Sequence, residues 1–264
     1  MANPSTSLPD SIATERDGPL LRVTLRRAAK RNALDDATVL ALDVAFSTIP
    51  SDVRAVILEG EGEHFSAGLD LSELRERDAS EGVLHSMMWH RAFEKIQFGR
   101  VPVVAVLKGA VIGGGLELAC AAHVRVAERS TFYALPEGQR GIYVGGGASV
   151  RLPRLIGVAR MMDMMLTGRT YDAEEGSRLG FAQYLVEPGA GAAKALELAR
   201  RIAANTPMTN FAILHALPRI AEAAPATGFM AEALMAGIAQ SDPEAKARIR
   251  DFLEKRAAKV AASS

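Results

Sequence analysis

The chain of 264 residues contains a single cysteine, Cys120, and aromatic residues make up only 5% of it. One cysteine excludes an internal disulfide framework and fits a reducing compartment, so we expect a cytoplasmic protein. No run of about eighteen apolar residues occurs, which excludes a transmembrane helix of ordinary length. No group of cysteine, histidine and acidic residues has metal-ligand spacing, so we expect no metal ion.

An excess of either charge is also absent. The 31 basic and 31 acidic residues cancel, so neither nucleic acid nor an acidic membrane is indicated as a partner. Hydrophobic residues make up 48% of the chain, an ordinary globular balance. Residues 1–17 are rich in Ser, Thr, Pro and Asp and lack an apolar segment. We therefore predict a flexible N-terminal tail there, not a secretory signal.

Strands and helices alternate through most of the remaining chain. The hydrophobic pattern predicts strands at 20–25, 53–58, 101–107, 124–127, 131–134 and 184–186. It predicts helices at about 35–48, 81–98, 158–166 and 174–179, and one directly after the glycines at 113–115. From residue 190 onward only helices are predicted, at about 190–204, 207–223, 227–240 and 244–262. This order favours an α/β body over 18–204 and a helical region over 205–264.

Three consecutive glycines, Gly113-Gly114-Gly115, separate a buried strand from a helix that carries Glu117. Glycines are costly in backbone entropy, and close approach of a ligand to the backbone is the usual reason for them. The helix would point unpaired N–H groups and a positive dipole end at that ligand, which suits an anion or a developing oxyanion. A tight strand–helix turn with a favourably placed glutamate is the alternative without a function.

Two more glycine-rich loops follow predicted strands, where binding groups are commonly found. The first spans 59–70, and the second spans 136–147 and holds five glycines. The motifs are Phe65-Ser66-Ala67-Gly68-Leu69-Asp70-Leu71, Gly113-Gly114-Gly115-Leu116-Glu117-Leu118-Ala119, and Pro136-Glu137 with Gly141. Together they resemble the crotonase family, the enoyl-CoA hydratase and isomerase superfamily. Supporting matches in the same order are Arg31-Asn32-Ala33-Leu34, Leu166-Thr167-Gly168-Arg169 and Phe252-Leu253-Glu254-Lys255-Arg256.

The resemblance implies a crotonase-like spiral of strand–strand–helix repeats with a helical C-terminal trimerisation region. It also implies an acyl-CoA substrate, no cofactor beyond the CoA moiety, and a homotrimer or dimer of trimers. Carried over by motif, the backbone N–H groups of Leu69 and Gly114 would form an oxyanion hole. The residues expected to bind CoA or substrate are Lys30, Arg31, Ala67, Gly68, Asp70, Gly113 and Tyr143.

The resemblance assigns catalysis to two carboxylates, with Glu117 activating water and Glu137 exchanging the proton at the α-carbon. Two nearby carboxylates in a partly dry site can titrate differently, which lets one act as acid and the other as base. Both positions are glutamate in the family's hydratases. We therefore expect an enoyl-CoA hydratase that reversibly adds water to the 2,3 double bond of an enoyl-CoA thioester. Simple capping of a helix and of a turn is the alternative for the two residues.

Other activities within and beyond the family stay open. They are an enoyl-CoA or dienoyl-CoA isomerase that uses Glu137 alone, an aromatic acyl-CoA hydratase-lyase, and a non-catalytic scaffold. Dehalogenation is rejected, because the nucleophilic aspartate of the resembling dehalogenases would fall at about Gly145. Tyr143 stands near the family's usual loop proline and either faces the acyl group or fills space. Trp89, His90 and Phe93 lie on a helix that is expected to line the acyl pocket, although the shared helical face of Trp89 and Phe93 favours core packing for these two. His64 is expected on an exposed loop.

Overall fold

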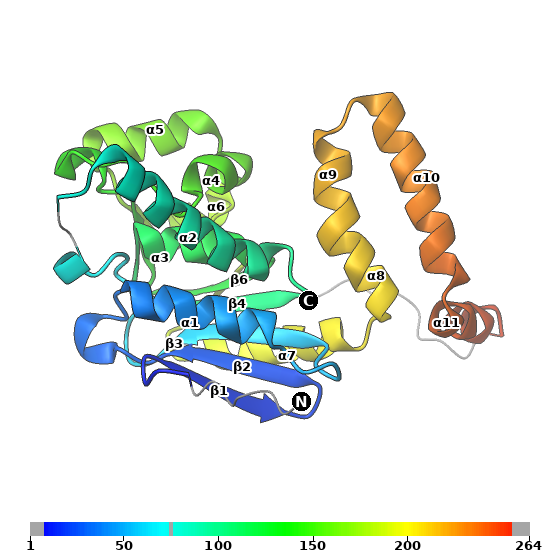
Figure 1. The fold of residues 1–264 in the computed structure, drawn as a ribbon. Helices are drawn as coiled ribbons and strands as arrows, with labels where there is room; N and C mark the ends of the chain where they lie inside the picture. Colours follow the sequence, from blue (N-terminus) through cyan, green and yellow to red (C-terminus); the bar gives the residue numbers. More distant parts are fainter. Residues whose placement is uncertain (1–7, 74–75, 255–264) are drawn as a thin grey trace, which may run out of the picture. The chain divides into compact units, whose positions relative to one another are not determined.

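The structure, a computed structural model, describes residues 8–73 and 76–254. The chain divides into two compact units, Met1–Ala203 and Ala204–Ser264. The first unit contains every strand that the structure describes, and the second is helical (Figure 1).

A six-stranded sheet forms the centre of the first unit, in the order β1-β2-β3-β4-β6-β9. Its strands are β1 (Ile12–Asp17), β2 (Leu20–Leu25), β3 (Ala55–Gly60), β4 (Val103–Leu107), β6 (Val124–Glu128) and β9 (Tyr184–Val186). All neighbours pair in parallel except β1 and β2. The strand β4 is buried at every residue, as expected where helices cover both faces of a parallel sheet.

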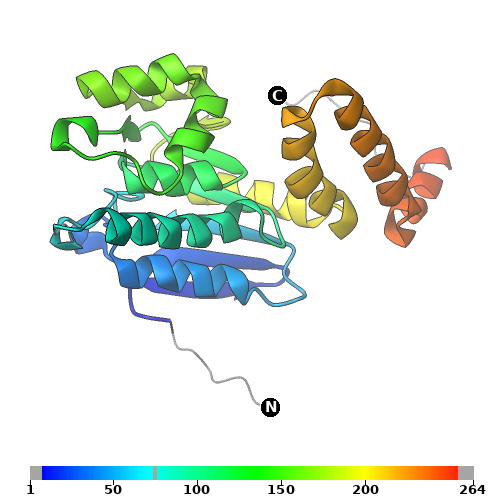
Figure 2. The same cartoon turned by 45° about the horizontal axis from the view of Figure 1, so that its top comes forward.

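Helices cover the two faces of this sheet. The helices α1 (Asp36–Ser47), α2 (Ala79–Gln97) and α3 (Gly114–Ala121) pack on one face, where α1 and α2 run side by side (Figures 1 and 2). The helix α7 (Gly191–Ala203) packs on the other face, against apolar residues of β2, β3, β4 and β6. Asp35 caps α1 by accepting a hydrogen bond from the Thr38 N–H.

A second, three-stranded sheet lies next to the glycine-rich segments. It consists of β5 (Ala110–Ile112), β7 (Phe132–Ala134) and β8 (Tyr171–Asp172), in the order β5-β7-β8. The strand β5 leads directly through Gly113 into α3, so the sheet fixes where the glycine helix begins. The helices α4 (Ala148–Ile156), α5 (Val158–Thr167) and α6 (Ala173–Leu179) complete this unit.

The second unit consists of α8 (Pro207–Phe211), a π-helical segment (Ala212–Ala216), α9 (Leu217–Glu222), α10 (Pro225–Ser241) and α11 (Pro243–Leu253). In both views α9 and α10 lie side by side (Figures 1 and 2). The unit exposes several large apolar side chains, namely Phe229, Met230, Leu234, Phe252 and Leu253. None of the helices in the described part of the chain is long and apolar enough to cross a membrane.

One prediction of secondary structure is wrong, and one helix was not predicted. The segment Ile12–Asp17, predicted as part of a flexible tail, is an edge strand paired antiparallel with Leu20–Leu25. Only Ile12 of this strand is buried, so its sequence lacks an apolar signal, and the pairing follows from a tight turn at Gly18 (φ 55°). The helix α4, which was not predicted, begins directly after the glycines at 145–147, and Pro153 within it is unfavourable for a helix interior. Residues 1–7 of the predicted tail and 255–262 of the last predicted helix lie outside the described residues.

Candidate active site

A cavity of about 320 Å³ in the first unit joins the three glycine-rich segments to α2. Its lining residues are Leu69, Arg77, Gly82, His85, Ser86, Trp89, Gly114, Glu117, Glu137, Ile142, Tyr143, Val144, Gly145 and Gly146. Five of the predicted site residues are among them, two from the catalytic pair, two from the oxyanion hole and Tyr143.

The N–H of Gly114 opens the helix α3 and has no acceptor one turn back within that helix. A Cβ atom at this position would lie 2.6 Å from Cζ3 of Trp89 and 3.4 Å from the Leu69 nitrogen. Only glycine therefore lets the indole and the first loop approach the start of the helix so closely.

The orientation of the Leu69 N–H is fixed by backbone hydrogen bonds of the residues before and after it, Gly68 and Asp70. Gly68 O accepts from the Leu34 N–H at 2.7 Å, and the Asp70 N–H donates to Leu34 O at 2.8 Å. In a trans peptide the N–H points opposite to the carbonyl of the same unit, so the Leu69 N–H points away from Leu34. Among the described residues, neither this N–H nor that of Gly114 has an acceptor. Two unpaired donors from adjacent segments thus line one cavity, which suits an oxyanion.

Glu117 lies on the first turn of α3, and only 4% of its surface is exposed. Its Oε1 accepts hydrogen bonds from the N–H groups of Gly146 (2.8 Å) and Ala148 (2.9 Å). Arg151 supports this arrangement by donating to Gly146 O at 2.8 Å. Burial raises the pKa of Glu117, while the two N–H donors and the charge of Arg151 oppose that rise.

Glu137 follows Pro136 in the third glycine-rich segment and is also buried. Its Oε2 has no hydrogen-bond partner among the described residues. Burial, with a further contribution from the charge of Glu117, raises the pKa of Glu137 to about 7, against the lowering effects of its backbone hydrogen bond and Arg140. A pKa raised toward neutral pH suits a group that exchanges protons.

The remaining predicted binding residues do not line the cavity. The Lys30 ammonium lies 3.0 Å from the Asp70 carboxylate, and Arg31 is exposed, with a left-handed backbone (φ 52°). Ala67, Gly68 and Gly113 lie directly before the two oxyanion-hole residues in the chain. Their predicted contacts with CoA stay predictions.

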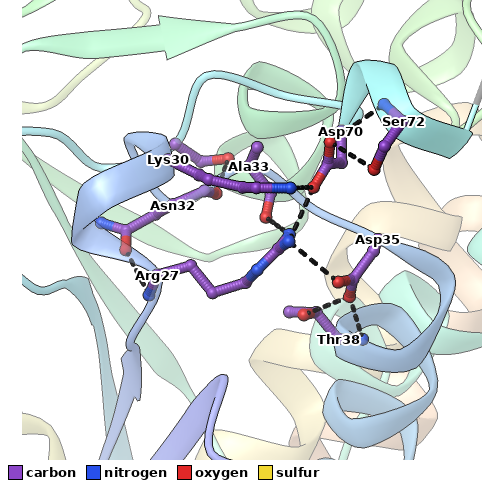
Figure 3. A network of polar contacts seen from close by, with 9 residues as sticks. Arg27, Lys30, Asn32, Ala33, Asp35, Thr38, Asp70 and Ser72 are labelled. Carbon is purple, nitrogen blue, oxygen red and sulfur yellow. Dashed lines mark hydrogen bonds and ion pairs between the residues drawn. The ribbon is translucent and has the colours of Figure 1, made fainter.

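Asp70 is a buried carboxylate with several donors around it (Figure 3). Burial raises its pKa, but hydrogen bonds from Ser72, Lys30 and Arg27 outweigh that effect and hold the pKa well below its ordinary value. With these partners the carboxylate has little capacity left for a ligand.

The helix α2 was expected to line the acyl pocket, and it contributes to the cavity wall, but the contribution of His85 was not predicted. Trp89 is buried with Phe93, as expected for core residues, yet it also forms part of the cavity wall. His85, whose Nε2 lies 2.7 Å from Asp36 Oδ1, is four residues before Trp89, and this helical spacing was the available signal. The expectation for His64 is wrong, since it is half-buried and its Nδ1 accepts a hydrogen bond from the Ala110 N–H. In the described part of the chain, no cluster of His, Cys, Asp and Glu could hold a metal ion.

Comparisons with known proteins place the chain in a family. The model of the family described as enoyl-CoA hydratase/isomerase matches residues 15–261. A short-chain-enoyl-CoA hydratase from Clostridium acetobutylicum is 31% identical, over 94% of this chain and 96% of its own length. A carnitinyl-CoA dehydratase from Salmonella arizonae is 36% identical, over 75% of this chain and 77% of its own.

Solved structures agree as well. The crystal structure of a proposed enoyl-CoA hydratase from Rhodopseudomonas palustris is 64% identical, with a TM-score of 0.91, and the match covers 93% of this chain and 95% of that one. An enoyl-CoA hydratase from Bacillus anthracis is 29% identical, with a TM-score of 0.87 and coverage of 93% and 96%. The predicted fold class is confirmed: the architecture is the α/β crotonase fold, with two sheets and C-terminal helices.

Proposed function

The chain belongs to the enoyl-CoA hydratase/isomerase family, and from this premise we propose that it is an enoyl-CoA hydratase. This hydro-lyase would reversibly add water across the 2,3 double bond of an enoyl-CoA thioester. One observation carries the proposal: two buried glutamates share a cavity with two backbone N–H groups that have no acceptor among the described residues.

The backbone donors would bind the thioester carbonyl oxygen. When water attacks the β-carbon, electrons move toward the carbonyl and negative charge develops on that oxygen. The N–H groups of Leu69 and Gly114 would stabilise this charge, and the loss of one such donor typically costs on the order of 3 kcal/mol of activation free energy.

The two carboxylates would divide the proton transfers. Glu117 would accept a proton from the water molecule while the water oxygen bonds to the β-carbon, C3. Protonated Glu137 would donate its proton to the α-carbon, C2. Return of a proton from Glu117 to Glu137 through solvent restores the starting state. The firmly held carboxylate of Glu117 suits a base, while the raised pKa of Glu137 supplies an acid near neutral pH.

The CoA moiety is the only cofactor-like group in this proposal. Lys30 and Arg31 would face its phosphates, Ala67, Gly68 and Gly113 would contact the thioester end, and Tyr143 would lie beside the acyl chain. We further propose a cytoplasmic homotrimer or dimer of trimers. The exposed apolar side chains of α10 and α11 support contacts of the second unit with other copies of the chain.

An enoyl-CoA isomerase is the second candidate. One observation favours it: Oε2 of Glu137 is buried without a partner among the described residues, while Oε1 of Glu117 already accepts two hydrogen bonds. A single proton shuttle at Glu137 would suffice for moving a double bond.

The test is to mix the purified protein with short, long and aromatic enoyl-CoA thioesters and follow loss of the conjugated absorbance. Products formed in ¹⁸O-labelled water are analysed by mass spectrometry, and Glu117→Gln and Glu137→Gln are assayed alongside. A hydratase incorporates the label and loses activity in both variants. A shifted double bond without label, with Glu117→Gln still active, would replace the proposal by an isomerase.

A further inference from the structure

The carboxylate of Asp70 lies one residue after the proposed oxyanion donor Leu69 and receives four hydrogen bonds (Figure 3). Its Oδ2 accepts from Arg27 Nη2 at 2.6 Å and from Lys30 Nζ at 3.0 Å. Its Oδ1 accepts from the N–H and the hydroxyl of Ser72, at 3.0 and 2.8 Å. Only 7% of the side chain is exposed. A buried carboxylate with this many donors is held in one position.

Arg27 connects Asp70 to the segment on the other side of the Leu69 backbone. Its Nη1 donates to Ala33 O at 2.6 Å, and its Nη2 also lies 3.1 Å from Asp35 Oδ2. Asp35 in turn caps α1 through the Thr38 N–H. The guanidinium therefore joins the loop before α1 to the first glycine-rich segment, and 18% of the Arg27 side chain is exposed.

These side-chain contacts enclose the backbone bridge between Leu34 and Leu69. Ala33, which Arg27 binds, precedes Leu34, and Asp70, which Arg27 also binds, follows Leu69. The bridge itself consists of the hydrogen bonds from Leu34 N–H to Gly68 O and from Asp70 N–H to Leu34 O. Because the Gly68 carbonyl and the Leu69 N–H belong to one planar unit, rotation of that unit would turn the N–H away from the cavity.

We propose that Arg27 and Asp70 are positioning residues that hold the Leu69 N–H in the orientation required for the oxyanion hole. The inference rests on the proposed function, because it assigns a task within that site. Neither side chain lines the cavity, so both act through the backbone. Substitution of either residue should destabilise the transition state, where the charge on the carbonyl oxygen is largest, more than it weakens substrate binding.

The test compares Asp70→Asn and Arg27→Gln with a matched pair of controls. Arg16 and Asp52 form an arginine–aspartate pair at 2.7 Å that is exposed and outside the cavity lining, so Arg16→Gln and Asp52→Asn make the same chemical changes. Arg27→Lys keeps the charge and tests rescue. For each variant, kcat, KM and the melting temperature are measured with one enoyl-CoA.

A spectroscopic measurement separates positioning from general stability. A bound CoA thioester with an extended conjugated acyl group shifts its absorbance to longer wavelength when N–H donors polarise its carbonyl. The wild-type shift therefore reports the oxyanion hole directly, without turnover.

We expect Asp70→Asn and Arg27→Gln to lower kcat by about 10- to 100-fold, leave KM within about threefold, and reduce the shift of the bound chromophore. Arg27→Lys should keep part of the kcat that Arg27→Gln loses. If Asp70→Asn does not fold, the two Arg27 variants are compared with the controls instead. The inference is overturned if kcat and the spectral shift of both variants match those of the two controls. If the wild type hydrates no enoyl-CoA, the proposed function fails, whereas the spectral shift still tests Arg27 and Asp70.

Discussion

Glu117 and Glu137 line one cavity but differ in their hydrogen bonds, because two backbone N–H groups hold Oε1 of Glu117 while Oε2 of Glu137 has no partner among the described residues. The first carboxylate is thus fixed in place. The second has a free oxygen and a pKa raised to about 7. In the proposed mechanism these different surroundings would let one carboxylate act as base and the other as acid.

The raised pKa of Glu137 predicts the alkaline limb of the pH profile. Hydration needs protonated Glu137, so kcat/KM should fall as the pH rises through about 7. Dehydration starts with the single proton on Glu117 instead, and because adding water to the double bond exchanges no net proton, its kcat/KM should follow the same profile. Initial rates in both directions between pH 5.5 and 9 measure this, and a hydration rate that stays constant above pH 7 would contradict the assignment.

The same pKa predicts an effect on stability. A folded-state pKa above the ordinary value of 4.5 favours folding below that value, and this contribution is lost as the pH rises through about 7. Glu137→Gln removes the buried charge and should therefore raise the melting temperature more at pH 8 than at pH 4.5. Equal changes in melting temperature at both pH values would show that burial does not destabilise the charged form of Glu137.

Gly114→Ala should abolish activity, because the new Cβ would lie 2.6 Å from the Trp89 ring beside the oxyanion donor. Displacement of the N–H by even a fraction of an ångström should lower kcat by about 100-fold or more. Gly237→Ala on α10 is the control, since no atom lies within 4 Å of its new Cβ. Comparable activity in both alanine variants would argue against the close approach at Gly114.

Arg151→Gln should weaken the support of Glu117. The guanidinium donates to Gly146 O, and its charge lowers the pKa of Glu117, so the substitution should raise that pKa further. We expect kcat to fall by about tenfold and the acidic limb of the pH profile to move to higher pH. Arg154→Gln, an exposed neighbour on α4, is the control. An unchanged acidic limb would show that Arg151 does not influence the pKa of Glu117.

Replacing Phe229 and Leu234 by aspartate should disrupt assembly. These side chains on α10 are 72% and 62% exposed in the isolated chain, and apolar surface of this kind favours contact with another subunit. Light scattering coupled to size exclusion should show a smaller species than the wild type. Glu232→Gln, an exposed polar change on the same helix, should leave the mass unchanged. A monomeric wild type would contradict the proposed trimer.

Features with a local cause were predictable from the sequence. The turn at Gly113-Gly114-Gly115, the helix that carries Glu117 and the cap at Asp35 all follow from residues adjacent in the chain. The pairing of Glu117 with Glu137 required the resemblance to a family, since spacing alone does not place two loops at one cavity.

Features that depend on distant partners could not be predicted. The role of Asp70 depends on Arg27, 43 residues earlier, and no local pattern shows that the two meet. The strand β1 exposes nearly all of its side chains, so only its backbone pairing reveals it. Similarly, the helical spacing of Trp89 and Phe93 predicted burial, whereas the expectation that their helix lines a pocket came from the family resemblance.

The indole of Trp89, which rests on the start of α3, has a practical consequence. It is the only tryptophan in the chain, so the intrinsic fluorescence of the protein comes chiefly from one ring in the wall of the cavity. Occupation of the cavity changes the polarity and the quenching around that ring. Ligand affinity can therefore be titrated on the unlabelled protein, including variants that no longer turn over.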